Sequence, residues 1–320
     1  MFKTYNFDNM MLIPRECVLD SRKDADVSAR LGNRTFKIPV MTANMPSIVD
    51  ESVAIKLASS GYLYNMHRFG VDVLAFCKKM ISLGLYVSIS VGIKPESYEL
   101  LTQLKENGIV PDYVSIDIAH GHNPRVKNVI DHIRSLFGDK TFVIAGTVAS
   151  PEGLRALEDW GADAVRVGIG QGHVCTTAFK TGFGTRNWQL SAVAECAKVA
   201  KKVVICDGGV YHTADIAKAI HVGAHWVMSG VLFSGTTDSP GTLVEKDGVK
   251  YKAYYGNASV RVKGDHHRIE GKETLIECTT TLADRLLEIE EDLQSAVSYS
   301  GGTKLEDIRK VDHVFVSTPN

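Results

Sequence analysis

One cysteine in a glycine-rich run is the side chain of this sequence best suited to covalent chemistry. Cys175 lies within GIGQGHVCTTAFKTGFG, residues 168–184. Glycine lets a backbone take positive φ and approach a ligand closely, and a thiolate is the strongest nucleophile among ordinary side chains. An inert structural cysteine rarely has so many glycine neighbours. We therefore interpret Cys175 as a nucleophile, flanked by Gly168, Gly170, Gly172, Gly182 and Gly184.

Eight short runs rich in Val and Ile are spaced along the chain and would position this loop. Most of them are followed by polar or glycine residues and then by a segment with helical periodicity. Short apolar runs that alternate with helices indicate strands buried on both faces of a parallel sheet. Eight such units predict an α/β fold of the (β/α)₈, or TIM, barrel type. The runs cover residues 38–45, 61–67, 86–92, 113–121, 142–148, 164–170, 203–209 and 226–230.

The helices between these runs have clear start and stop signals. Asn123 can cap a helix that has Pro124 at its first position, and an apolar face then continues to Gly138. Two further helices are expected to begin at Ser150 and at Thr213.

The ends of the last two predicted strands carry a glycine pattern suited to phosphate. In (β/α)₈ barrels the active site lies at the C-terminal ends of the strands, and loops after strands seven and eight often hold a phosphate. Gly208, Gly209 and Gly230 follow those strands, where backbone N–H groups can bind an anion. Asp207 can accept a hydrogen bond from a ribose hydroxyl. The pattern predicts a nucleotide or sugar phosphate as substrate.

We expect residues 1–320 to form one barrel domain with two additions. A polar, hairpin-like insertion at 231–280 follows the eighth strand, and we interpret it as a flap over the site. Residues 281–320 are expected to form a C-terminal helix and tail.

Composition and charge narrow the classes of function. The chain has 320 residues, 44% of them apolar, and a formal net charge of −1. A net charge this small argues against nucleic acid or a membrane surface as the main binding partner. No apolar run has transmembrane length, and the N-terminus lacks the apolar core of a signal peptide. Six scattered cysteines show no CxxC pairing or zinc-ligand spacing. These features predict a cytoplasmic enzyme with no nucleic-acid or membrane partner.

Several motifs together resemble the inosine monophosphate (IMP) dehydrogenase/guanosine monophosphate (GMP) reductase family. The similarity runs nearly end to end, and within the family it is strongest to the shorter bacterial type of GMP reductase. The most specific feature is the cysteine loop combined with DGG at 207–209. The motifs are FDNMMLIP, ANM, MHRF, ISVG, IDIAHGH, the cysteine loop, DGG, SPG, EGK and DLQSAVSYSGGTKL.

The resemblance implies reductive deamination of GMP to IMP in purine nucleotide interconversion. Cys175 would attack C2 of the purine, ammonia would leave, and NADPH would deliver a hydride to the covalent thioimidate. Thr177 and Glu270 match the pair that relays a proton to the departing ammonia in the family. Without the EGK motif, Glu270 would read as a solvated residue of a charged hairpin.

The resemblance also implies binding residues, a cation and an assembly. GMP is assigned to Met45, Asp207, Gly208, Gly209, Ser229, Gly230, Ser259, Arg268 and Gly271. NADPH is assigned to Ser21, Arg22, Arg68, Asp117, Ala119, Val204 and Val227. A monovalent cation such as potassium would bind backbone carbonyls near Gly170, Gly172 and Cys175. A homotetramer is expected. No Rossmann GxGxxG follows a strand, but a barrel can bind a dinucleotide across its rim without one.

Several positions depart from the usual family pattern. They are Gln171, His173, Thr147, the run Asn257-Ala258-Ser259, and Val231. None removes a catalytic group, so we expect altered affinity or base preference, and a modified guanine nucleotide or a deoxynucleotide remains an alternative substrate. As an imidazolium, His173 would lower the pKa of the Cys175 thiol, which we state as a hypothesis.

Three alternative functions stay open at this point. An IMP dehydrogenase would oxidise IMP with NAD to XMP through the same cysteine, but the Arg-Tyr pair that its hydrolytic step uses is missing from residues 254–270. A non-catalytic nucleotide sensor would be expected to lose the Cys-Thr-Glu set. A flavin-dependent barrel oxidase has no use for the cysteine loop. A zinc enzyme is disfavoured because the histidines lack ligand spacing; they include His120, His122, His173, His266 and His267.

Overall fold

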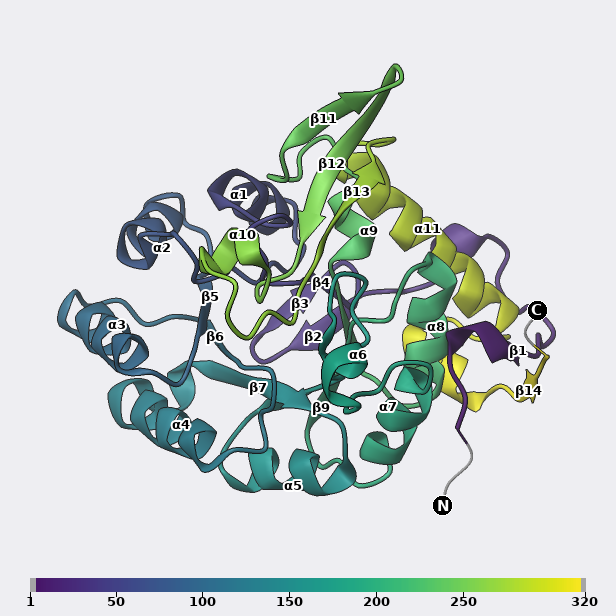
Figure 1. Ribbon diagram of the computed structural model, residues 1–320. Coiled ribbons are helices and arrows are strands. Elements are labelled where there is room, and N and C mark those ends of the chain that lie inside the picture. Colours follow the sequence, from purple (N-terminus) through teal and green to yellow (C-terminus); the bar gives the residue numbers. More distant parts are fainter. Residues whose placement is uncertain (1–3, 318–320) are drawn as a thin grey trace.

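A curled parallel sheet forms the centre of the computed structural model, which describes residues 4–317. Its strands follow the order β4-β10-β9-β8-β7-β6-β5, and helices surround them (Figure 1). All neighbouring strands in this sheet are parallel, as expected for strands buried on both faces. The strands are β4 (Val40–Thr42), β5 (Ser88–Val91), β6 (Tyr113–Asp117), β7 (Phe142–Val148), β8 (Ala164–Val167), β9 (Val203–Asp207) and β10 (Trp226–Ser229).

The predicted strand at 61–67 is an irregular wall segment between β4 and β5. Leu63 makes an isolated parallel bridge to Met41, and the N–H of Met66 donates to the carbonyl of Ser88 at 3.3 Å. Side chains make the remaining contacts to both neighbouring strands. For example, the hydroxyl of Thr42 in β4 accepts a hydrogen bond from the N–H of Asn65. The TIM-barrel-like fold is therefore confirmed, with seven regular strands in the described chain and an eighth wall held mainly by side chains.

The three helices whose start signals the sequence predicts, α4 (Pro124–Phe137), α5 (Pro151–Asp159) and α8 (Thr213–His221), begin at those signals. In α4, Oδ1 of Asn123 accepts a hydrogen bond from the N–H of Arg125 at 3.0 Å, and Gly138 follows with a φ of 60°. The other helices are α1 (Glu51–Ser59), α2 (Val73–Ser82), α3 (Pro95–Glu106), α6 (Thr177–Thr181), α7 (Gln189–Ala197), α9 (Val231–Ser234), α10 (Val260–Lys263) and α11 (Leu282–Tyr299). Short 3₁₀ turns lie at Phe7–Asn9, Arg22–Asp24, Gly138–Lys140 and Leu305–Lys310.

An aromatic cluster closes the N-terminal end of the barrel. The hairpin β2 (Ala29–Leu31) and β3 (Arg34–Phe36) brings the ring of Phe36 to 5.5 Å from Tyr86 and 5.6 Å from Trp226. Both contacts are edge-to-face, a favourable geometry for aromatic rings. A ligand must therefore enter from the opposite end, where the strands finish.

The insertion after β10 contains a three-stranded antiparallel sheet. Its strands are β11 (Leu243–Lys246), β12 (Val249–Tyr255) and β13 (Glu273–Glu277). Asp247 and Gly248 connect the first two with positive φ values of 54° and 75°, as a tight hairpin turn requires.

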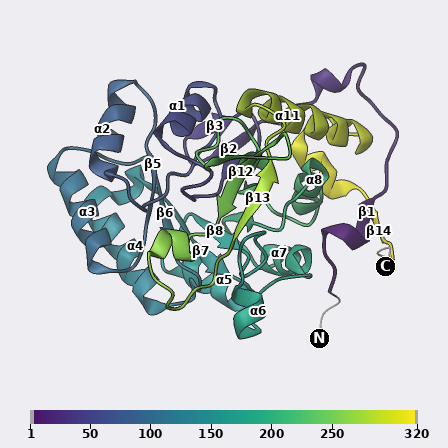
Figure 2. The ribbon, with the colours of Figure 1, turned by 45° about the horizontal axis from the view of Figure 1, so that its top comes forward.

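The chain between β12 and β13, residues 256–272, is here called the crossing segment. It contains α10 and lies over the C-terminal ends of the barrel strands in both Figure 1 and Figure 2. The structure thus gives the predicted insertion a place above the barrel. Its action as a flap, and the domain limits 231–280 and 281–320, remain predictions.

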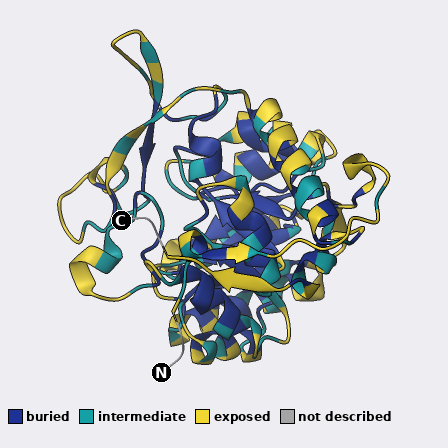
Figure 3. Cartoon of the chain, turned by 90° about the vertical axis from the view of Figure 1, so that its right-hand side faces the viewer, coloured by how far each residue is buried: buried dark blue, intermediate teal, exposed yellow. Residues whose placement is uncertain are grey.

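The two ends of the described chain meet beside α8. Strand β1 (Met10–Leu12) pairs antiparallel with β14 (His313–Phe315), and α11 packs against α8 (Figure 1). Figure 3 shows that the buried residues gather in the strands and on the inward sides of the helices, whereas the outer helix faces and the projecting hairpin are exposed. Within residues 4–317 no helix has the combined length and apolarity needed to cross a membrane.

Candidate active site

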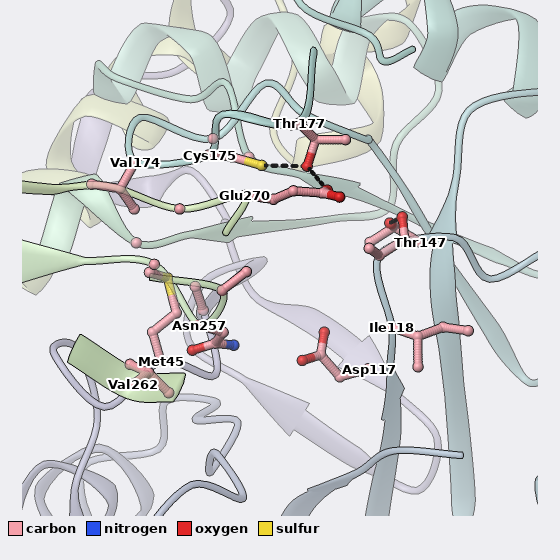
Figure 4. Close-up of a pocket in the computed structure, with 18 of the residues that line it drawn as sticks. Met45, Asp117, Ile118, Thr147, Val174, Cys175, Thr177, Asn257, Val262 and Glu270 are labelled. Carbon is pink, nitrogen blue, oxygen red and sulfur yellow. Dashed lines mark hydrogen bonds between the residues drawn. The ribbon is translucent and has the colours of Figure 1, made fainter. Parts of the chain in front are cut away.

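A cavity of about 680 Å³ lies where the barrel strands end below the crossing segment. Its walls come from the ends of β6, β7, β9 and β10, from the cysteine loop, and from the crossing segment (Figure 4). This volume is typical of a small-molecule site. The site therefore lies at the end of the barrel that the sequence predicts.

The cysteine loop and the crossing segment are joined by backbone hydrogen bonds around Cys175. The N–H of Thr176 donates to the carbonyl of Glu270 at 2.8 Å, and the N–H of Lys272 donates to the carbonyl of Val174 at 2.8 Å. These two bonds flank a short antiparallel bridge that includes Cys175 itself. They fix Glu270 opposite the thiol although the two segments are distant in sequence.

The three predicted catalytic side chains form a continuous row. Sγ of Cys175 lies 3.3 Å from Oγ1 of Thr177, and that hydroxyl donates to Oε2 of Glu270 at 2.6 Å (Figure 4). All three residues line the cavity. A thiol, a hydroxyl and a carboxylate in contact can attack an electrophilic carbon and move a proton to or from the leaving group.

The predicted phosphate cradle is only partly available. Gly208 and Gly209 have φ values of 78° and 77°, which other residues rarely adopt. The N–H of Gly208 already donates to the carbonyl of Met228 at 3.0 Å, so this amide does not face a ligand. The N–H groups of Gly209 and Gly230 have no hydrogen-bond acceptor among the described residues. Ser229 is buried, with its hydroxyl donating to a backbone carbonyl.

Tyr254 is a pocket residue that sequence reasoning missed. It lies at the end of β12, is only 3% exposed, and directs its hydroxyl to the sulfur of Met45 at 3.9 Å. A Cβ at position 230 would overlap that hydroxyl, so Gly230 is required for Tyr254 to pack here. Burial raises the pKa of Tyr254, and the phenol stays neutral. No sequence signal distinguishes this tyrosine from its hairpin neighbours.

Asp117 and Asp207, predicted for the cofactor and the substrate, both line the cavity. The buried guanidinium of Arg166 lies between them, 3.0 Å from Oδ1 of Asp117 and 2.7 Å from Oδ2 of Asp207. Sequence reasoning missed Arg166, but a signal was present. An arginine inside the apolar run AVRV must find buried charged partners.

The other predicted cofactor residues fall into three groups, of which two belong to the barrel. Arg68 and Ala119 line the cavity, and the Arg68 guanidinium lies 4.5 Å above the Phe69 ring while its Nε has no partner in the described chain. Val204 and Val227 are fully buried within β9 and β10, where they pack inside the barrel wall. Their assignment to the cofactor remains a prediction.

Ser21 and Arg22 lie against α11, outside the set of residues that line the cavity. Ser21 caps a 3₁₀ turn by accepting a hydrogen bond from the N–H of Lys23. The Arg22 side chain stacks on Tyr299 at 5.3 Å and donates to its hydroxyl at 3.4 Å. The structure therefore does not bring these two residues to the rest of the predicted cofactor site.

The crossing segment carries the remaining residues predicted for GMP. Arg268 and Gly271 line the cavity. Ser259 is 3% exposed, and its hydroxyl has no hydrogen-bond partner in the described chain. Asn257 donates from Nδ2 to the carbonyl of Asn44 at 3.0 Å, whereas its buried Oδ1 has no partner. Buried polar atoms without a hydrogen-bond partner in the protein are expected where a polar ligand binds.

Two other departures from the family pattern have structural contacts. Thr147 lies one residue before the end of β7 and donates its hydroxyl to the carbonyl of Ala119 at 3.2 Å. Gln171 is 7% exposed, accepts a hydrogen bond from Thr185 at 3.3 Å, and also lines the cavity. Both residues fix the shape of the pocket rather than replace a catalytic group.

His173 does not carry the charge that its predicted effect on Cys175 requires. Its ring stacks on Tyr254, with centroids 6.1 Å apart and planes at 19°. Burial lowers the pKa of His173, and the positive charges of Lys272 and Arg186 lower it further. The imidazole is therefore neutral near pH 7, and the hypothesis that an imidazolium here activates Cys175 is wrong.

Within residues 4–317 no cluster of three or more His, Cys, Asp or Glu side chains is arranged to hold a metal ion. Gly170 and Gly172 lie in the cavity wall, and the carbonyl of Gly172 accepts a hydrogen bond from the N–H of Cys175 at 3.0 Å. A monovalent cation held by backbone carbonyls in this loop remains a prediction.

Comparisons with known proteins agree with this site. A family described as "IMP dehydrogenase / GMP reductase domain" matches residues 4–320. A protein named GMP reductase from Albidiferax ferrireducens is 50% identical over 316 residues, which cover 99% of this chain and 97% of the relative. Proteins of the same name from Shouchella clausii and Bacillus subtilis are 51% and 50% identical over 317 residues, covering 99% of this chain and 96% and 97% of their own lengths. The chain thus belongs to the IMP dehydrogenase/GMP reductase family.

Proposed function

We propose that this protein is a GMP reductase that converts GMP to IMP and ammonia at the expense of NADPH. The observation that carries the proposal is the row of Cys175, Thr177 and Glu270 at the cavity wall. The similar proteins from three bacteria, all named GMP reductase, support the same choice of substrate.

Cys175 is proposed to form the covalent intermediate. Its sulfur adds to C2 of the purine, and the bond from C2 to the exocyclic amino group then breaks, leaving a thioimidate and ammonia. A hydride added to C2 allows the bond between carbon and sulfur to break, which releases IMP and restores the thiolate. The glycine-rich loop permits the close approach that the first step needs.

Thr177 and Glu270 are proposed to move the proton that ammonia requires. The hydroxyl of Thr177 contacts both the sulfur and the carboxylate, so a proton can pass along this row toward the departing amino group. The backbone bond between Thr176 and Glu270 keeps the carboxylate in place during that transfer.

The ribose and phosphate of GMP are proposed to bind where β9 and β10 end at the cavity wall. Asp207 offers a carboxylate oxygen to a ribose hydroxyl, and the unpaired amide of Gly230, which lines the cavity, offers a donor to the phosphate. The amide of Gly209 is also unpaired, although Gly209 is not among the residues that line the cavity. Met45 and Tyr254 form an apolar boundary beside them. A modified guanine nucleotide or a deoxynucleotide remains compatible with this arrangement.

NADPH is proposed to bind in the remaining part of the cavity, because the residues there offer a cation and a carboxylate to the dinucleotide. Arg68 has an unpartnered buried Nε, and Asp117 lies on the same side as Ala119 and Thr147. These groups would hold the nicotinamide half, and the bound cofactor would supply the hydride. Ser21 and Arg22, if they contact the cofactor, would do so from a neighbouring copy of the chain.

Assembly, location and ion requirement are further parts of this proposal. We propose a cytoplasmic homotetramer. In such an assembly a neighbouring copy of the chain could bring its Ser21 and Arg22 to the cofactor. A monovalent cation such as potassium would order the carbonyls of the cysteine loop near Gly170 and Gly172. Stimulation of the purified protein by potassium over lithium at constant ionic strength would test that ion.

The activity itself is tested by two parallel assays on the purified protein. GMP with NADPH is expected to decrease the NADPH absorbance and to release one ammonia for each NADPH consumed. IMP with NAD is expected to give no continuing NADH formation beyond one equivalent per active site, because residues 254–270 lack the Arg-Tyr pair that hydrolysis uses in family dehydrogenases. NADH formation from IMP without NADPH loss from GMP would reverse the assignment.

A further inference from the structure

Arg166 occupies an unusual place for a charged side chain, because it lies inside the barrel and below the cavity. It belongs to β8, and only 4% of the residue is exposed. Its Nε donates to Oδ2 of Asp207 at 2.8 Å, and its Nη1 donates to Oδ1 of Asp117 at 3.0 Å. Nη2 lies 2.7 Å from the same oxygen of Asp207. One guanidinium thus holds two carboxylates that come from different strands.

The strand register explains how Arg166 reaches across the sheet. Asp117 of β6 is level with Gly146 of β7, and Gly146 is level with Arg166 of β8. The three positions form a row across neighbouring strands on one face, and the middle position carries no side chain. A Cβ at Gly146 would lie 2.6 Å from Cβ of Arg166. The glycine therefore leaves the space through which the guanidinium contacts Asp117.

Each carboxylate has one oxygen bound to Arg166 and one oxygen left for a ligand. Oδ1 of Asp207 and Oδ2 of Asp117 have no hydrogen-bond donor among the described residues, and both side chains line the cavity. Figure 4 shows the carboxylate of Asp117 directed into the open space of the site. Two N–H donors of the guanidinium hold one oxygen of Asp207, and a third holds one oxygen of Asp117, so these charge-assisted bonds limit how each carboxylate can turn and where its free oxygen lies.

We infer that Arg166 is a positioning residue that holds Asp207 and Asp117 ready to accept hydroxyl hydrogens from the substrate and from the dinucleotide, respectively. This inference rests on the proposed function. Arg166 contacts neither ligand, and its contribution passes through the two aspartates. Because one guanidinium serves both carboxylates, a single substitution at position 166 affects both binding subsites.

The electrostatics of the group agree with this role. A buried guanidinium is costly unless it is paired, and here two carboxylates pair with it. Burial raises the pKa of Asp207, and the charge of Arg166 opposes that shift. Without Arg166, the free oxygen of Asp207 would be protonated at a higher pH and would then be a poorer acceptor for a hydroxyl.

The test measures KM for both ligands in three variants at several pH values. Arg166→Met is expected to raise KM for GMP and for NADPH by about tenfold or more each, as for the loss of charge-assisted hydrogen bonds. Its KM for GMP is expected to rise further as pH falls from 8 to 6. Arg166→Lys keeps the charge and is expected to recover part of both affinities. Gly146→Ala is expected to disturb the contact with Asp117 and so to raise KM for NADPH more than KM for GMP.

A matched control separates positioning from general damage to the fold. Arg134 also binds an aspartate, Asp163, at 2.6 Å, but at the N-terminal end of β8, away from the cavity. Arg134→Met is expected to lower thermal stability and leave both KM values unchanged. A purely structural role for Arg166 would lower the active fraction, and hence kcat, without moving KM. If Arg166→Met keeps both KM values within twofold of wild type, or if Arg166→Lys recovers neither affinity, the inference is wrong. A failed proposed function would instead appear as a wild-type protein that does not oxidise NADPH with GMP.

Discussion

The hydroxyl of Thr177 donates a 2.6 Å hydrogen bond to Oε2 of Glu270, although the two residues are 93 positions apart in sequence. Thr177 begins α6, and Glu270 lies in the crossing segment, so this bond connects the cysteine loop to the insertion above the barrel. The same hydroxyl lies 3.3 Å from Sγ of Cys175. The proposed proton transfer therefore depends on the position of the insertion as well as on the loop.

Glu270→Gln is expected to slow ammonia release more than hydride transfer. The amide still accepts a hydrogen bond from Thr177 but cannot take up a proton, so kcat should fall by roughly 10²–10⁴-fold, the usual contribution of a general acid or base. Ammonia release from GMP without NADPH, followed by NADPH addition to the accumulated adduct, separates the two steps. Glu273→Gln, at an exposed position three residues later, is the control and should match wild type. Equal slowing of both steps would remove Glu270 from the proton path.

Thr177→Val is expected to be as damaging as Glu270→Gln, since it removes the hydroxyl that joins the thiol to the carboxylate at nearly constant volume. The double variant should be little worse than either single one, because residues that act as a unit are not additive. Steady-state kcat for the four proteins measures this. Multiplicative losses would indicate that the two side chains act separately.

Gly230→Ala is expected to weaken GMP binding through Tyr254. The added methyl group overlaps the tyrosine hydroxyl, and overpacking of this kind costs about 1–3 kcal/mol, or roughly a tenfold or larger rise in KM for GMP. Tyr254→Phe removes the overlapping oxygen, so the double variant should regain part of the affinity. If Tyr254→Phe gives no recovery in the Gly230→Ala background, the contact does not define the pocket.

Stability is expected to fall on acidification partly because of His67. This residue is 5% exposed, and burial lowers its pKa from 6.5 to about 4. The unfolded chain therefore binds a proton that the folded chain excludes, so the stabilisation present above pH 6.5 is lost as pH falls toward 4. Between pH 7 and pH 5 this one residue should remove about 2 kcal/mol of unfolding free energy.

Urea unfolding of wild type and His67→Gln at those two pH values checks this effect. The variant has no titrating ring at this position, so its loss between pH 7 and pH 5 should be smaller than that of wild type by about the same 2 kcal/mol. An identical loss in both proteins would place the acid sensitivity elsewhere.

The strands and helices of the barrel could be predicted because their signals are local. Asn123, Pro124 and Gly138 mark both ends of α4, and the apolar runs match the strands of the central sheet. Residues 61–67 were less predictable, since the side chains of Tyr64 and Asn65 replace the regular ladder there. That substitution depends on neighbours in space, which the run itself does not reveal.

The candidate site was predictable where residues belong to motifs and not where they depend on packing across the fold. The cysteine loop and EGK indicated Cys175 and Glu270, and the structure brings them together. Tyr254 gains its place only because Gly230 lies beside it in the folded chain. Arg166 could have been suspected from its apolar surroundings, but its two partners become visible only through the strand register.

The most direct test of the covalent scheme is the rate of NADPH oxidation by Cys175→Ala at saturating GMP. The thiol is the only proposed nucleophile, so the variant should show no GMP-dependent turnover while calorimetry still detects GMP binding. Cys278→Ala, at a partly exposed position outside the cavity wall, should retain the wild-type rate. If Cys175→Ala oxidised NADPH with GMP at a rate near that of wild type, the covalent mechanism would be contradicted.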